Sequence, residues 1–363
     1  MSSTLRVDKK DLDQLVSALV SRYRVFGPVE LDGATLLREV KTADGLALEA
    51  RALDGPAKAA FFPQTETLLY YDNGTAEPPP GKDKPTAIIG LRPCDARSLL
   101  MLDKVFSTGK YRDIPWQRRQ DDNLVIGLGC GAPLETCFCN WLGSGPFDPQ
   151  GSDVMLTDIG DAYIAESCTD KGERFLKTAF KSQVQRPSQA DLDKAGEVRS
   201  RAQQSLGAAV DVSGVKPALA SLLDSPLWDE VALECLSCAA CAYLCPTCHC
   251  FDVQDETIPG TKQGRRVRIW DSCMSALFTK EASGHNPRGA AKDRMRQRVM
   301  HKFSYFVESY GETACVGCGR CIRLCPVNLD IRDVLKKVVS RQYTAVRAEA
   351  KGQKSKVKGQ NAG

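Results

Sequence analysis

The sequence predicts two domains, an α/β domain followed by a mostly helical one. In the first part of the chain, two short apolar runs at residues 86–91 and 123–128 have the length of buried strands, and each ends in a turn. In the second part, two dense groups of cysteines lie between segments with helical spacing. A chain of 363 residues is long enough for two or three domains with separate cores.

The α/β domain is expected over residues 1–185. A turn and then a segment with helical spacing, ARSLLMLDKVF, follow the run at 86–91. Residues 153–166 read as two strands around a Gly-Asp turn. Strands that alternate with helical segments indicate an α/β sheet.

Composition changes near Pro187, so a helical linker is expected over residues 186–225, with a serine as its start signal. Ser225-Pro226 then opens a helix, and a mostly helical domain is expected over 226–340. The tail at 341–363 is basic and poor in apolar residues, which predicts disorder.

Cysteine is the unusual residue, with 16 copies against three histidines. The first residues are charged where a signal peptide needs an apolar stretch, and no window approaches the ~18 apolar residues of a membrane span. We therefore expect a cytoplasmic protein without membrane insertion, whose reduced thiols are available to bind metal. The net charge of +4 gives no reason to expect nucleic acid as a partner.

Two segments share one cysteine pattern, in which three cysteines two residues apart are followed by x3-Cys-Pro. The first reads CLSCAACAYLCP and starts at Cys235, and the second reads CVGCGRCIRLCP and starts at Cys315. This spacing is typical of proteins with two [4Fe–4S] clusters, in which the fourth cysteine serves the other cluster. Structural zinc prefers paired C-x2–4-C knuckles, which fit this pattern poorly.

Each predicted cluster therefore takes three cysteines from one motif and its fourth from the other motif. Cluster 1 is assigned to Cys235, Cys238, Cys241 and Cys325, and cluster 2 to Cys315, Cys318, Cys321 and Cys245. The segment between the motifs is longer than a small ferredoxin needs, and residues 270–279 and 286–306 read as helices. We thus expect an enlarged, helical dicluster ferredoxin domain. Its many arginines are expected to be mostly solvated, with a minority that offsets cluster charge.

A third metal site is predicted in the first domain. Cys94 and Cys130 each follow a predicted strand, and ligands in α/β sheets gather at the carboxyl ends of strands. Cys137 and Cys139 come shortly afterwards in GCGAPLETCFCNW. These four cysteines predict a further [4Fe–4S] cluster, with zinc or simple packing of buried thiols as alternatives. Four cysteines are left over, and Cys168 receives no role. The other three are expected to pack, with lining of the cluster pocket or binding of another group as alternatives; they are Cys248, Cys250 and Cys273.

Several segments of the chain resemble those of a known family. The segments LRPCDARSLLMLDKVF, CFCNWLGSGPF, CPTCHCFDVQDE, RRVRIWDSCM, GHNPR and HKFSYF carry the resemblance over roughly residues 60 to 335. The family includes the iron–sulfur beta subunit of sulfhydrogenases, the similar iron–sulfur subunit of anaerobic sulfite reductase and that of flavin oxidoreductases that partner heterodisulfide reductase-like proteins. The resemblance implies an electron relay between a reductase subunit that binds flavin and NAD(P) and a catalytic subunit of hydrogenase, sulfite reductase or heterodisulfide reductase-like type.

The residues agree with a subunit that does no substrate chemistry of its own. No nucleotide-binding glycine loop is visible, because Gly317-Cys-Gly319 belongs to a cluster motif. No P-loop and no Ser/His/Asp set is recognisable either. An alternative makes the cysteine site of the first domain catalytic on a disulfide or sulfur species.

Overall fold

The computed structural model describes residues 3–81, 84–120, 122–179 and 185–341. These residues form two compact units. Unit 1 comprises Met1–Ala209, Tyr243–Asp271 and Val316–Arg320, and unit 2 comprises Val210–Ala242, Ser272–Cys315 and Cys321–Gly363. The units interleave along the chain instead of following the expected ranges 1–185, 186–225 and 226–340, because short pieces of the cysteine-rich region pack with the first unit. The predicted tail, 341–363, lies outside the described residues apart from its first residue.

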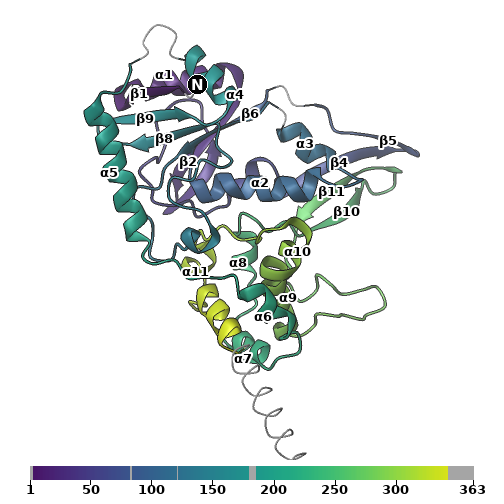
Figure 1. Cartoon of the computed structure of the whole chain (residues 1–363). Coiled ribbons are helices and arrows are strands. Elements are labelled where there is room, and N and C mark those ends of the chain that lie inside the picture. Colours follow the sequence, from purple (N-terminus) through teal and green to yellow (C-terminus); the bar gives the residue numbers. More distant parts are fainter. Residues whose placement is uncertain (1–2, 82–83, 121, 180–184, 342–363) are drawn as a thin grey trace, which may run out of the picture. The chain divides into compact units, whose positions relative to one another are not determined.

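A seven-stranded sheet forms the centre of unit 1 (Figure 1), in the order β1-β9-β8-β7-β6-β2-β3. Strands β2, β6, β7 and β8 run parallel, and β1, β3 and β9 are antiparallel to their neighbours. The strands are β1 (Thr4–Asp8), β2 (Arg24–Leu31), β3 (Ala34–Glu39), β6 (Thr86–Leu91), β7 (Leu124–Leu128), β8 (Val154–Asp158) and β9 (Ala162–Ser167). Strands are therefore present at all the predicted positions between residues 86 and 166. The N-terminal strands β1, β2 and β3 were not predicted.

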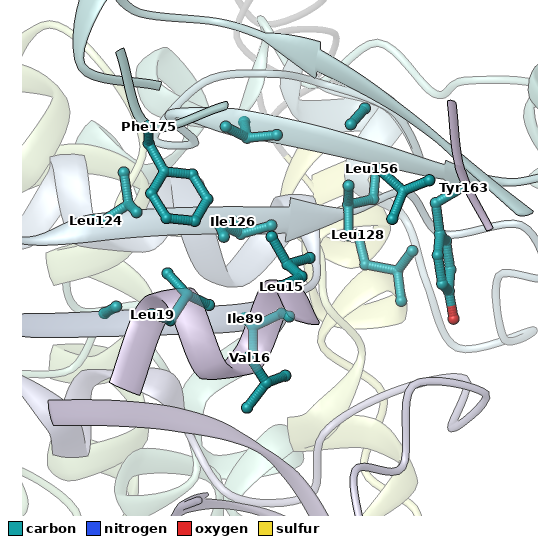
Figure 2. Close-up of a cluster of buried hydrophobic side chains, with 14 of the residues drawn as sticks. Leu15, Val16, Leu19, Ile89, Leu124, Ile126, Leu128, Leu156, Tyr163 and Phe175 are labelled. Carbon is teal, nitrogen blue, oxygen red and sulfur yellow. The ribbon is translucent and has the colours of Figure 1, made fainter. Parts of the chain in front are cut away.

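Every residue of β6 and β7 is buried, because helices cover both faces of this sheet. Helices α1 (Leu12–Arg22) and α4 (Asp170–Ala179) share a core with Ile89 and Ile126 (Figure 2). The neighbouring Ile88 and Val125 belong to a second core with α2 (Pro93–Ser107) and Trp116 of α3 (Ile114–Gln120). Successive side chains of a strand point to opposite faces, so these two cores lie on opposite sides of the sheet.

A second sheet in unit 1 has the order β10-β11-β4-β5, with all strands antiparallel. The strands are β4 (Thr65–Asp72), β5 (Thr75–Glu77), β10 (Phe251–Thr257) and β11 (Gln263–Trp270). The helix expected over 270–279 is therefore wrong, because Trp270 ends a strand and turns follow it. The expectation of a mostly helical region over 226–340 is not confirmed, because this hairpin lies inside it.

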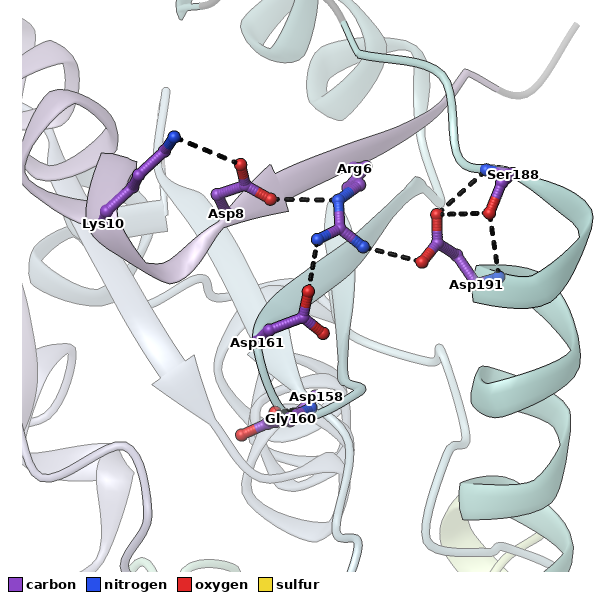
Figure 3. A network of polar contacts seen from close by, with 8 residues as sticks. All are labelled: Arg6, Asp8, Lys10, Asp158, Gly160, Asp161, Ser188 and Asp191. Atoms are coloured by element: carbon purple, nitrogen blue, oxygen red, sulfur yellow. Dashed lines mark hydrogen bonds and ion pairs between the residues drawn. The ribbon is translucent and has the colours of Figure 1, made fainter.

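Helix α5 (Gln189–Ser205) begins in a capping box between Ser188 and Asp191, as the serine start signal predicts. It packs Ala195 on β9. Figure 3 shows Arg6 of β1 beside the start of this helix, bonded to Asp191 at 2.6 Å and to Asp161 at 2.5 Å. Arg6 thus ties the first strand to the β8–β9 turn and to α5.

Unit 2 is built from helices. They include α6 (Val215–Ala220), α7 (Leu227–Leu233), α9 (Ala291–Met300), the π-helical segment η4 (His301–Tyr305) and α10 (Phe306–Tyr310), and residues 331–341 are helical as well. The short helices α8 (Ala240–Tyr243) and α11 (Arg320–Arg323) lie within the two cysteine motifs. The predicted apolar face of Met295, Val299 and Phe303 is buried. Among the described residues, no helix is both long and apolar enough to cross a membrane.

Candidate iron–sulfur sites

The two cysteine motifs have the same backbone conformation around their second cysteine. The residues on both sides of Cys238 and of Cys318 have positive φ. These flanking residues are Ser237, Ala239, Gly317 and Gly319, with φ of 55°, 62°, 64° and 72°. Left-handed residues on both sides of a cysteine curl the chain, so that successive backbone N–H groups can point into a concave surface. Both motifs therefore form loops suited to an anionic group.

Backbone N–H groups donate to the thiol sulfurs of unit 2. The N–H of Ser237 lies 3.3 Å from Cys235 Sγ, and the N–H of Leu329 lies 3.3 Å from Cys325 Sγ. Hydrogen bonds to cysteine sulfur tune the potential of a bound cluster.

One cavity of unit 2 is lined by all the ligands predicted for cluster 1. These are Cys235, Cys238, Cys241 and Cys325, and Cys321 lines the cavity as well. Most of the other lining residues are apolar, including Met274, Met295 and Leu329, and the one cation among them is Arg298. Four thiols in an apolar cavity suit an iron–sulfur cubane, whose ligands are thiolates and whose potential depends on solvent exclusion.

A buried basic stripe runs along α9 and η4, formed by Arg294, Arg298 and Lys302. Arg294 Nη2 donates to Ser237 Oγ at 3.2 Å, in the first motif. Lys302 Nζ donates to the carbonyl of Ala314 at 3.0 Å, directly before the second motif. Three of the arginines between the motifs are buried, namely Arg268, Arg294 and Arg298, and burial of a cation is costly unless an opposite charge offsets it.

The first-domain cysteines follow neighbouring strands, as predicted. Strands β6 and β7 pair in parallel, so Cys94 at the start of α2 and Cys130 after β7 lie at the same edge of the sheet. Cys139 is buried, and Cys94, Cys130 and Cys137 are partly exposed. All four cysteines belong to unit 1.

These four thiols influence one another. Burial raises the pKa of Cys137 to about 11, and the neighbouring Cys130 and Cys318 contribute to the rise. Burial also raises the pKa of Cys139 to about 12, with Cys137 and Cys130 as further causes. The pKa of Cys94 is raised well above its usual value, first by burial, then by Asp95 and Cys318 and also by Cys137. The sulfurs of the predicted third site thus form one electrostatic group.

The second motif packs directly on the loop that carries Cys137 and Cys139. The Phe138 N–H donates to the Gly317 carbonyl at 2.8 Å, and Cys137 Sγ lies 3.9 Å from the Cys318 carbonyl oxygen. A Cβ on Gly317 would lie 2.5 Å from the backbone nitrogen of Cys139. The two backbones therefore approach each other as closely as only glycine allows.

Two arginines support the loop around Cys130 through carbonyl groups. Arg92 donates to the carbonyls of Leu48 and Gly129, and Arg51 donates to those of Ala132 and Pro133. Both cations lower the pKa of Cys130, although burial raises it overall. In the part of the chain that the structure describes, Arg92 makes no ion pair with a carboxylate, and its hydrogen bonds go to backbone carbonyls. Burial lowers the pKa of Arg92, and the thiols of Cys130 and Cys94 oppose that shift.

The donor set fits a cluster at this third site. Arg320 Nη1 and Thr136 Oγ1 are buried without a hydrogen-bond partner, and both could donate to cluster or cysteine sulfur. Within the described ranges, no three His, Cys, Asp or Glu side chains are grouped closely enough for a single metal ion. A cubane places each thiolate on a separate iron, so its ligands stand further apart than those of one zinc ion. Sequence reasoning did not single out Arg92, Asp95 or Arg320, although the first two flank Cys94.

The ligands predicted for cluster 2 are divided between the units. Cys245 and Cys318 belong to unit 1, and Cys315 and Cys321 belong to unit 2. Within unit 1, burial raises the pKa of Cys318, and Cys245 is near enough to raise it further.

Of the remaining cysteines, Cys248 is buried, and its carbonyl accepts from Lys58 at 2.6 Å. Cys250 and Cys273 are partly exposed, and Cys168 is exposed.

Two comparisons with known proteins agree with this description. Residues 234–329 match the family model described as a 4Fe-4S dicluster domain. The chain is 29% identical over 317 residues to the sulfhydrogenase 2 subunit beta of Pyrococcus furiosus, which covers 87% of this chain and 92% of that protein. The resemblance inferred from the sequence motifs is thereby confirmed.

Proposed function

We propose that this chain is an electron-transfer component of an oxidoreductase complex. It matches a 4Fe–4S dicluster domain, and it resembles a sulfhydrogenase beta subunit over most of its length. It would hold two clusters at its dicluster motifs and a third at the first-domain cysteines. Each cluster, when bound, accepts and releases one electron at a time. The protein residues supply ligands, exclude water and set the local charge.

The observation that carries this proposal is the cavity in unit 2. Cys235, Cys238, Cys241 and Cys325 line it together, although Cys325 lies far along the chain from the other three. This combination supports the cross-ligation that the spacing predicts, in which the fourth cysteine of one motif serves the cluster of the other. For cluster 2, the assignment of Cys245, Cys315, Cys318 and Cys321 rests on the same spacing rule.

The third cluster is proposed from chemistry in unit 1. Four thiols share one electrostatic environment at the carboxyl ends of β6 and β7. Arg92 supplies a buried positive charge beside Cys130 and Cys94. A buried cation without a carboxylate partner is stabilised when the neighbouring thiols are ionised, and thiolates are the ligands that iron needs.

The proposed partners rest on the relative's name and on the family resemblance of the sequence. The relative is named as a subunit of a sulfhydrogenase, which supports a catalytic partner subunit for this chain. From the family resemblance we further propose that the chain passes electrons between that partner and a reductase subunit that binds flavin and NAD(P). A catalytic partner of the hydrogenase type agrees best with the relative's name. Partners of the sulfite reductase or heterodisulfide reductase-like type would require the same relay.

Iron and sulfide analysis of anaerobically purified protein tests the proposal, together with electron paramagnetic resonance of the reduced state. Three clusters correspond to about twelve irons and twelve sulfides per chain, and two clusters to about eight of each. The isolated chain is expected to show reducible [4Fe–4S] signals without oxidising NAD(P)H. A colourless protein without sulfide would contradict the function, and turnover of a disulfide or sulfur compound by the pure chain would favour a catalytic first-domain site instead.

A further inference from the structure

A buried ion pair lies between the predicted third site and the second cysteine motif. Arg320 follows Cys318 by two residues, and Asp95 follows Cys94 directly. Arg320 Nη2 donates to Asp95 Oδ2 at 2.6 Å. Arg320 is 2% exposed and Asp95 is fully buried. All these residues belong to unit 1.

The ion pair is held in place by the backbone, but two of its polar atoms have no hydrogen-bond partner. Arg320 Nε donates to the carbonyl of Leu53 at 2.8 Å, which fixes the plane of the guanidinium. Arg320 Nη1 and Asp95 Oδ1 are both buried without a hydrogen-bond partner. Unpaired buried polar atoms are costly, so a native structure keeps them where another group completes the site. Cluster and cysteine sulfurs accept hydrogen bonds, so they would satisfy the donor at Arg320 Nη1.

Each member of the pair lies next to a predicted cluster ligand. Asp95 Oδ2 lies 4.0 Å from Cys94 Sγ. Arg320 stands two residues after Cys318 in the chain. Because Arg320 is bonded to Asp95, the cation and the anion are held together next to both ligand segments.

Stability alone does not account for such a pair. Burying two charges costs about as much as their attraction returns, and apolar side chains of similar size often stabilise a protein equally well. A fixed cation or anion beside a redox centre, by contrast, changes the energy of adding an electron. In a poorly screened interior, this effect is stronger than in water.

We propose that Arg320 and Asp95 are positioning residues that set the reduction potentials of two neighbouring clusters, the one bound through Cys94 and the one bound through Cys318. This inference rests on the proposed function. Reduction adds one negative charge to a cluster, so the guanidinium of Arg320 stabilises the reduced state and the carboxylate of Asp95 destabilises it. The pair acts on both clusters at once.

The test compares Arg320→Gln, Asp95→Asn and the double variant by redox titration monitored with electron paramagnetic resonance. Arg320→Gln is expected to make both clusters harder to reduce, and Asp95→Asn is expected to make both easier to reduce. Each change should alter the one-electron equilibrium at least tenfold, which corresponds to about 59 mV. The double variant should lie between the two. The cluster of the Cys235 cavity, which neither residue lines, serves as the internal reference.

Shifts of the reduction potential in opposite directions in the two single variants distinguish this role from a structural one. Both single variants break the same ion pair, so a purely structural role predicts shifts in the same direction or equal loss of iron. Such a result, or unchanged potentials in both variants, would overturn the inference. Arg320→Lys retains the charge and should keep the cluster of Cys318 within the tenfold limit. Iron analysis of the unaltered chain is read separately: about eight irons would remove the third cluster of the proposed function, while the shift at Cys318 would still test the pair.

Discussion

A methyl group added at Gly317 tests whether the second motif must approach the Cys137 loop closely. Gly317 has φ of +64°, and its Cβ would lie 2.5 Å from the nitrogen of Cys139 and from the carbonyl of Phe138. The obstructing atoms are backbone, so no side-chain rotation relieves the overlap. Gly143 has φ of +68° and nothing within 4 Å of its Cβ position, which makes Gly143→Ala the matched control.

The expected costs differ between the two variants. Both pay about 1–2 kcal/mol for an alanine in the left-handed region. Gly317→Ala must also separate the loops and lose the bond from the Phe138 N–H to the Gly317 carbonyl. An orphaned buried N–H adds about 1–3 kcal/mol. At about 2–4 °C per kcal/mol for a unit of this size, Gly143→Ala should lower the melting temperature by a few degrees and Gly317→Ala by about 10 °C.

Thermal unfolding of anaerobic protein, followed by circular dichroism, measures the difference, and iron analysis of the same samples reports the clusters. Gly317→Ala should also lose about four irons, because the ligand loop of the third site is displaced. Equal melting temperatures and equal iron contents in the two variants would refute the close approach as the reason for glycine at this position.

Two further variants test other parts of unit 1. The buried Arg268 pairs with Glu66 and Asp113, so Arg268→Met should lower the free energy of unfolding in urea by about 3–5 kcal/mol. The control Arg265→Met, on the exposed face of the same strand, should lower it by less than about 1 kcal/mol. The hydrogen bond from Arg6 lowers the pKa of Asp161, so the ionised carboxylate stabilises the folded protein above the unfolded pKa of about 3.9, and this stabilisation is lost as the pH falls further. Asp161→Asn should therefore reduce the difference between the unfolding midpoints measured at about pH 6 and about pH 3. An unchanged pH profile of the unfolding midpoint would contradict this.

Sequence reasoning succeeded where the local pattern and the final burial agree. Residues 87–91 and 124–128 carry no polar side chain, and they form strands that are buried on both faces. Because these strands are parallel neighbours, the common edge of Cys94 and Cys130 followed from sequence alone. Ser188 likewise starts a helix through a purely local capping box.

It failed where partners distant in the sequence decide the structure. Every residue of β10 is exposed, and β11 contains RRVRIW, so neither shows the apolar alternation of a half-buried strand. Strand β11 forms by pairing with β4, about 200 residues earlier. Arg268 is buried because Glu66 of β4 meets it. No local pattern predicts such a pair, and the same is true of Arg320 with Asp95.

A comparison of the two cysteine motifs shows which glycines the loop conformation requires and which ones the packing around the loop requires. Ser237 and Ala239 adopt the same left-handed conformation as Gly317 and Gly319, so the loop itself tolerates a Cβ at both positions, at a cost in strain. Glycine is required in the second motif for a different reason, because a Cβ on Gly319 would lie 2.5 Å from the carbonyl oxygen of Thr136. The difference between CLSCAAC and CVGCGRC therefore marks the second motif as the one whose backbone packs on another ligand loop.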